Sequence, residues 1–171
     1  MANPAQALKN ELDREAGSTR RLLERVPADR LDWQPHPKSM TLGQLAIHLA
    51  GIPGNISRMA RLDGFDAATA NFTPTTPPDI DVLLPTLESS LAEARSLLDD
   101  LDEESAVAPW RLTVGEREVF TLPRLEVVRT LLLNHWYHHR GQLAVYLRLL
   151  DIPVPAVYGR SADENPFEAA A

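Results

Sequence analysis

Apolar residues recur at steps of three and four residues in four long stretches of the chain, a spacing typical of amphipathic helices. The spacing is most regular in the fourth stretch, where it runs from Leu125 through Leu132 to Leu143. Proline clusters separate the stretches, and proline interrupts helices because it has no amide hydrogen to donate. The pattern predicts helices at residues 4–26, 42–62, 80–102 and 123–150.

Single residues refine this prediction. Asn3 followed by Pro4 is typical of a helix start, and Asp79 is expected to cap the third helix. Pro53 lies inside the second helix between two nearby glycines, and we expect the helix to bend there. Trp33, in the first long loop, is expected to anchor that loop against the helices.

The segment before the fourth helix has a different pattern. Residues 110–121 alternate weakly around Gly115, which predicts a short hairpin. Residues 153–171 are rich in proline and are expected to form a tail that packs at first and frays at its end. Helices without strand–helix alternation favour an all-α, four-helix bundle with a small hairpin, formed by one domain over residues 1–171.

Composition limits the function classes. With 44% hydrophobic and 24% charged residues, the 171-residue chain matches an ordinary globular domain. The net charge of −7 and the scattered arginines argue against a nucleic-acid partner. The polar N-terminus lacks a signal-type segment, and no stretch predicts a membrane span, so we expect a cytoplasmic protein without a membrane partner.

The chain contains no cysteine, which excludes disulfides, thiolate metal sites and a thiol nucleophile from the protein itself. A metal ion would therefore be held by histidine or carboxylate. His135 and His139 are four residues apart, so they share one helix face, and that face is the apolar stripe of the fourth helix. His48 lies on the inward stripe of the second helix. Together the three could form a facial metal site with open positions for water or substrate.

The histidines also have interpretations that involve no metal ion. A histidine pair at this spacing can be a surface or hydrogen-bonded couple, and His48 alone can be a core residue with satisfied hydrogen bonds. His36, in a Pro-His-Pro loop, is expected to face solvent.

The residues around the pair have several open roles. His138 is assigned to the surroundings of the site, to a substrate contact or to the surface. Gln142 lies near the histidine face and is expected to support a ligand or to bond a neighbouring helix. Arg140 is expected to pair with a carboxylate between helices or to lie in solvent. Gly141 predicts the close approach of a neighbouring helix.

Two motifs resemble a known family. The fourth helix reads His135-Trp-Tyr-His-His-Arg-Gly-Gln-Leu143, and the second reads Thr41-Leu-Gly-Gln-Leu-Ala-Ile-His48. Together with Leu31-Asp-Trp33, these motifs resemble the DinB / YfiT-like superfamily of damage-inducible-type proteins, and the resemblance extends from the first helix to about Tyr158.

The resemblance implies a four-helix bundle with up-down-down-up connectivity, frequent homodimers, and one divalent metal ion held by His48, His135 and His139. Zinc and nickel are the first expectations, and iron and manganese are the alternatives, because imidazole suits several ions. Members of the wider group include thiol-dependent transferases and isomerases that use mycothiol or bacillithiol.

We therefore expect a metal-dependent transferase or hydrolase that acts on a small molecule, with a low-molecular-weight thiol as a candidate cosubstrate. No carboxylate lies within one turn of the three histidines on either helix, so the sequence names no general base and no catalytic side chain. The alternatives are a non-catalytic metal-binding protein with a stress-response or ligand-binding role, and a metal-free bundle with core histidines.

Overall fold

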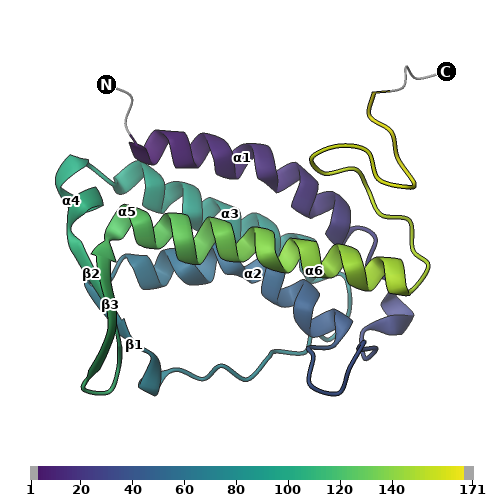
Figure 1. Cartoon of the computed structure of the whole chain (residues 1–171), viewed down its shortest axis with the longest axis horizontal. Coiled ribbons are helices and arrows are strands. Elements are labelled where there is room, and N and C mark those ends of the chain that lie inside the picture. The colour runs from purple at the N-terminus through teal and green to yellow at the C-terminus, as the bar shows by residue number, and fades with distance from the viewer. Residues whose placement is uncertain (1–3, 168–171) are drawn as a thin grey trace.

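Four long helical segments lie side by side in the computed structural model, which describes residues 4–167 (Figure 1). They are α1 (Pro4–Leu23), α2 (Leu42–Ala60), α3 (Leu83–Asp100) and a final segment that ends in α6 (His135–Leu149). The final segment begins with α5 (Arg124–Val127) and continues through the π-helical stretch η3 (Val128–Asn134). No helix among the described residues is long and apolar enough to cross a membrane.

The core lies between these segments. Helix α2 packs against α3 and α6, and α1 contacts α3 and α6. Each long segment contributes fully buried side chains at the helical spacing that the sequence displays, including Leu12, Leu45, Leu87, Leu132 and Trp136. Burial of these apolar side chains is the main stabilising contribution to the fold.

The helix ends differ from the predictions by a few residues. Helix α1 ends at Leu23, and α3 begins at Leu83. Asp79 does not cap α3, because its carboxylate accepts the amide of Asp81 (2.8 Å) in a turn before the helix, and the residue at the N-cap position is Val82. The expected cap at Asn3 and the expected fraying of residues 168–171 lie outside the described residues.

The small sheet is larger than the predicted hairpin, so the all-α prediction needs correction. Strands β2 (Pro109–Val114) and β3 (Arg117–Pro123) pair antiparallel around Gly115, whose positive φ of 60° suits glycine. Strand β1 (Gly64–Asp66) adds to β2 in parallel, giving the order β1-β2-β3. Three residues are too few to display an alternating pattern, which is why the sequence did not reveal β1.

A short helix before the sheet was also missed. Helix α4 (Glu103–Val107) begins with two glutamates, and its N-cap is Asp102. The Asp102 carboxylate accepts the Ser105 amide (2.7 Å), and the Ser105 hydroxyl accepts the Asp102 amide (3.0 Å). This reciprocal capping explains the acidic residue at position 102.

Arg124 closes the far end of α2. Its guanidinium is buried, with a relative exposure of 8% for the residue, and donates to the backbone carbonyls of Ala60 and Leu62. These carbonyls lie at the C-terminus of α2, where the helix has unpaired acceptors and the negative end of its dipole. Arg124 also pairs with the exposed Asp63 (3.1 Å).

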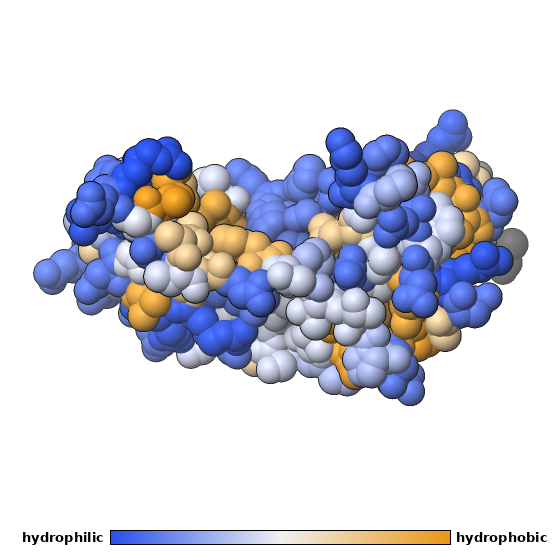
Figure 2. Space-filling model, turned by 90° about the horizontal axis from the view of Figure 1, so that it is seen from below, coloured by the Kyte–Doolittle hydropathy of each residue, from blue (hydrophilic) through white to orange (hydrophobic). Residues whose placement is uncertain are grey.

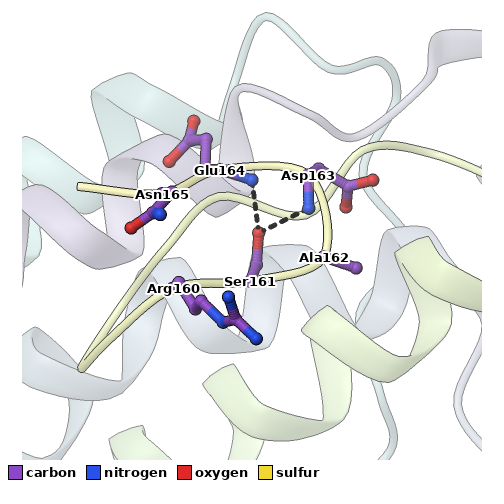
Figure 3. A pocket seen from close by; sticks show the side chains of 6 residues that line it. All are labelled: Arg160, Ser161, Ala162, Asp163, Glu164 and Asn165. Atoms are coloured by element: carbon purple, nitrogen blue, oxygen red, sulfur yellow. Dashed lines mark hydrogen bonds between the residues drawn. The ribbon is translucent and has the colours of Figure 1, made fainter. Parts of the chain in front are cut away.

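The tail folds back on the helices. Figure 3 shows its turn at residues 160–165, in which the Ser161 hydroxyl accepts the amides of Asp163 (3.1 Å) and Glu164 (2.9 Å). The two carboxylates pair with Arg148 and Arg21, respectively. The concavity at this turn is built from polar atoms that the turn itself uses, and it holds no histidine.

Candidate metal centre

Helix α2 contains a proline close to His48, and a side chain from α6 compensates for it. The helix continues through Pro53, which has no amide hydrogen to donate to the carbonyl of Leu49. The indole Nε1–H of Trp136 donates to that carbonyl instead (3.0 Å), and both residues are fully buried. Because Leu49 follows His48 and Trp136 follows His135, this bond sets the histidines of the two helices opposite each other.

Helix α3 holds the same part of α2 from the other side. The buried Ser90 hydroxyl donates to the Gly51 carbonyl (3.0 Å) and accepts the Gly54 amide (3.1 Å). A Cβ atom at position 54 would lie 2.8 Å from the Ser90 Oγ and 3.0 Å from its Cα, so this contact requires glycine. The proline-containing turn is therefore fixed by both neighbouring helices.

The three predicted histidines converge. The Nε2 atom of His135 lies 2.8 Å from that of His139 and 3.4 Å from that of His48. One ligand atom from each of the three lies within 4.8 Å of the other two. Nitrogen ligands about 2.0–2.1 Å from one ion and about 90–110° apart are separated by about 2.8–3.4 Å. The two Nε2 distances from His135 therefore suit a single metal ion.

Hydrogen-bond acceptors at Nδ1 orient the rings of His139 and His135. The Nδ1–H of His139 donates to the Gln142 side-chain carbonyl (2.7 Å), and the Nδ1–H of His135 donates to the Leu131 backbone carbonyl (3.3 Å). A carbonyl oxygen only accepts, so the ring proton of each neutral histidine is assigned to Nδ1. Each Nε2 then presents a lone pair, and the lone pairs point to the same place.

The protein environment keeps these imidazoles neutral. Burial lowers the pKa of His139 to about 4, against a weaker opposing effect of the bond to Gln142. Burial also lowers the pKa values of His48 and His135, and the neighbouring His135 adds to the effect on His48. Neutral imidazole is the form that binds metal ions, so the three side chains are ready to act as ligands near neutral pH.

The backbone before His135 is unusual. Residues Val128–Asn134 form a π-helix, in which each turn contains more residues than in an α-helix. The stretch includes Leu131, whose carbonyl orients the His135 ring. Such turns are rare and occur frequently at functional sites. The apolar spacing of this segment predicts a regular helix and did not reveal it.

A cavity of about 620 Å³ opens onto the histidines. Its wall comes from the middle and end of α2, from Met40 before that helix, and from β1, α3 and α6. The rest of the wall comes from the strap, which we define as residues 70–78 between η2 (Ala67–Thr69) and α3. Figure 1 shows the strap running as a coil below α2, and Figure 2 shows this side of the molecule, with a hollow beside a band of hydrophobic atoms. The site can therefore receive a small molecule next to the three histidines.

The other predicted residues separate into two groups. Gln142 accepts a hydrogen bond from His139, as described, whereas His138 is exposed and its ring centre lies 5.0 Å from that of His139. Arg140 is 3% exposed and lies on the side of α1, where it pairs with Glu15 (2.6 Å). The structure thus places Arg140 in the packing of α6 against α1 and not at the histidines.

Three further residues can be compared with their predictions. Gly141 is exposed, and a Cβ atom there would meet nothing within 4 Å, so the expected close helix approach is wrong for the described chain. His36 is exposed, and its Nδ1 accepts the Lys38 amide (3.1 Å). Trp33 packs edge-on against Tyr146, with ring centres 5.6 Å apart.

Sequence reasoning missed most of the cavity wall and the bond between Trp136 and Leu49. The wall includes strap residues that have no periodic pattern, so nothing in their sequence indicates that they lie over α2. The sequence does contain an indication of the hydrogen bond between Trp136 and Leu49. A proline inside a helix always leaves the carbonyl four residues earlier without its helical donor. Trp136 is the inward-facing donor on another helix that replaces it.

Known proteins share this architecture. The sequence matches the DinB family over residues 1–166. It is 27% identical to the protein YrdA of Bacillus subtilis over 153 residues, which cover 88% of this chain and 85% of YrdA.

Two crystal structures have a similar fold. A DinB-like protein from Bacillus cereus superposes with a TM-score of 0.66 at 22% identity, covering 87% of this chain and 94% of that one. The DinB-like protein YjoA from Bacillus subtilis also has a TM-score of 0.66, at 18% identity, covering 90% of this chain and 99% of that one. The family match spans nearly the whole sequence and contains both histidine-bearing helices, and the chain therefore belongs to the DinB family.

Proposed function

We propose that the protein binds one divalent metal ion through the Nε2 atoms of His48, His135 and His139. The observation that carries this proposal is the 2.8 Å separation between the Nε2 atoms of His135 and His139. In both rings, Nδ1 faces a carbonyl oxygen that accepts its hydrogen. Two lone pairs at this distance repel each other unless a cation lies between them. Because burial lowers the pKa values of these histidines, a metal ion suits the position better than a proton does.

Zinc and nickel are the ions that we propose first, with iron and manganese as alternatives. Three imidazoles form an all-nitrogen donor set, which zinc and nickel accept readily, and the chain has no cysteine to favour a softer ion. Three protein ligands leave at least one position for an exogenous molecule, as in catalytic zinc sites.

We further propose that the protein is a metal-dependent transferase or hydrolase that acts on a small molecule. If it is a transferase, its nucleophile is a low-molecular-weight thiol. A divalent ion in such a site lowers the pKa of a bound thiol or water, which makes a nucleophile available near neutral pH. In this reaction the protein groups orient the metal-binding histidines and bind the substrate. Gln142 and the Leu131 carbonyl hold the ring protons of His139 and His135 at Nδ1, and the apolar side chains of the cavity wall contact the substrate.

A second candidate function is metal-dependent ligand binding without turnover. The specific observation in its favour is that the cavity lining contains no aspartate, glutamate, lysine or tyrosine from the described residues. General acid–base catalysis therefore has no partner there apart from the histidines themselves. An enzyme at this site must take its nucleophile from the metal-bound molecule, whereas a binding protein needs none.

Elemental analysis of untagged protein tests the metal centre. We expect about one equivalent of metal per chain in the wild type, and less than about a tenth of that in His48→Ala and His139→Ala, because two imidazoles hold an ion far more weakly than three. His36→Ala and His138→Ala are matched controls that remove exposed histidines and should keep the ion. Equal metal contents in all variants, or no metal after reconstitution, would refute the proposal.

Turnover is tested separately with the reconstituted protein. A panel of thiols is combined with small electrophiles and ester or amide substrates, and His139→Ala is the control. Product formation that requires both metal and His139 supports the enzyme. Metal-dependent ligand binding without product across the panel supports the binding protein.

A further inference from the structure

The cavity over the histidines has an uncharged wall. Its apolar residues come from α2, the loop before it, β1 and the strap: Met40, Ile47, Ile56, Met59, Phe65 and Phe72. Its polar side chains are neutral amides and hydroxyls, such as those of Asn55 and Thr86. No aspartate, glutamate, lysine or arginine among the described residues lines it.

We propose that this site accepts uncharged, largely apolar molecules and discriminates against molecules with a second anionic group away from the metal. The inference rests on the proposed metal centre and adds the chemical class of the ligand. A volume of about 620 Å³ is in the range of sites for drug-sized molecules, so the ligand is larger than a water or a simple anion.

The charge balance explains the discrimination. His48, His135 and His139 would bind a metal ion as neutral ligands, so the ion would supply the positive charge in the cavity. A thiolate bound to it would neutralise part of that charge. An anionic group several bonds away from the sulfur would lie against Ile56, Met59 or Phe65 without a cation to pair with. Burial of an unpaired charge is unfavourable, because the group loses its hydration without compensation.

A nearby arginine does not change this balance. Arg58, one turn after the lining residue Asn55, donates to the Asn55 side-chain carbonyl (2.5 Å). Its other nitrogen pairs with Glu93 of α3 (2.5 Å). The guanidinium is therefore directed to a carboxylate outside the cavity lining, and its charge is already balanced.

The strap provides a second observation. Phe72 has a relative exposure of 72%, although it lines the cavity. An exposed aromatic ring at the mouth of a site gains free energy when a ligand covers it, and only an apolar ligand surface provides that gain. The strap is anchored near one end, where the buried Pro77 lies close to Gly43 and the Thr76 hydroxyl accepts from Gln44 (3.3 Å).

Two thiols of equal length test the proposal. 6-Mercaptohexanol and 6-mercaptohexanoate carry the same sulfur and the same chain, and they differ in charge at the far end. Each is titrated into Co(II)-reconstituted protein near neutral pH, and binding is followed by the thiolate-to-cobalt charge-transfer absorption. After correction for thiol ionisation, we expect the alcohol to bind at least tenfold more tightly than the carboxylate.

Position 72 provides a variant that leaves the core untouched. Phe72→Lys places a cation at the mouth and should reduce or reverse the preference, because the carboxylate then has a partner. Phe72→Ala is the matched control, which should weaken binding of the alcohol and leave the carboxylate's affinity nearly unchanged. Both substitutions replace an exposed side chain, so folding is not at risk.

The outcomes separate this inference from the proposed function. Cobalt content and the ligand-field spectrum are measured before any thiol is added, and failure to bind cobalt overturns the metal centre and the inference together. Cobalt binding with equal or tighter binding of the carboxylate, or without binding of either thiol, overturns the inference alone. An unchanged preference in Phe72→Lys also contradicts it.

Discussion

Replacing Trp136 with phenylalanine removes the donor that serves the Leu49 carbonyl. That carbonyl is buried, and Pro53 cannot supply the helical amide hydrogen, so the substitution leaves an unpaired acceptor in the core. An unpaired buried carbonyl costs about 1–3 kcal/mol. The smaller ring also leaves a cavity of about three heavy atoms, which adds about 1–2 kcal/mol.

The two effects together lower the free energy of unfolding by about 2–5 kcal/mol. For a domain of this size, the melting temperature should fall by roughly 5–15 °C. Urea unfolding followed by circular dichroism measures the change, with a chelator present so that metal binding does not contribute.

Trp110→Phe is the control for the volume of the ring. Trp110 is also fully buried, and its indole donates to the Met59 carbonyl at the longer distance of 3.4 Å. That carbonyl keeps a partner, because it also accepts the Leu62 amide (3.2 Å). Trp110→Phe should therefore cost only the cavity contribution, about 1–2 kcal/mol.

A second substitution tests the mechanism directly. Pro53→Ala returns an amide hydrogen four residues after Leu49, so it can satisfy the carbonyl that Trp136→Phe leaves unpaired. We expect Pro53→Ala to stabilise the Trp136→Phe variant by at least about 1 kcal/mol more than it stabilises the wild type. Additive effects within about 0.5 kcal/mol would refute the argument that the indole replaces the missing amide.

Three other predictions concern the histidine cluster and one helix end. Gln142→Leu should weaken metal affinity by about 10- to 100-fold in a chelator competition assay, whereas Gln142→Glu keeps an acceptor for His139 and should retain the ion. Metal affinity should change little from pH 7.5 to 6.5, an interval over which three imidazoles with the ordinary pKa of about 6.5 would lose about sixfold through protonation. It should fall as the pH approaches the lowered pKa of His139, about 4, and a sixfold loss by pH 6.5 would contradict neutral buried histidines. Arg124→Met should destabilise by about 2–4 kcal/mol in urea unfolding, because two carbonyls at the end of α2 lose their donor, whereas Arg95→Met breaks only an exposed pair and should cost less than about 1 kcal/mol; similar losses would contradict the capping role.

Periodicity was sufficient to predict the long helices and the histidines that share a face. His135 and His139 could be paired because helical geometry relates residues four apart without knowledge of the remaining fold. Their convergence with His48 was a hypothesis that depended on two inward stripes, and the distances between Nε2 atoms in the structure support it. Side-chain pattern along one helix therefore identifies candidate ligands, and contact between helices decides which of them meet.

The features that the sequence did not reveal depend on contacts between distant segments. Strand β1 has three residues and exists because it pairs with β2. The strap covers α2 without any pattern that would place it there. Gly141 shows the converse case, because a helical glycine predicts close packing only if a neighbouring helix lies on that side. Such features follow from tertiary structure, which local propensity does not encode.

The proline in α2 connects the fold to the site. A proline inside a helix is unfavourable, and the cost is offset here by a donor from α6 and by the Ser90 hydroxyl from α3. Both partners are specific in direction and distance, unlike apolar contacts, which tolerate sliding of one helix along another. The bond between Trp136 and the Leu49 carbonyl therefore sets the register of α2 against α6. Leu49 directly follows His48, and Trp136 directly follows His135. A conventional helix with alanine at position 53 would need no such partners, and the separation of the two histidines would then depend on apolar packing alone.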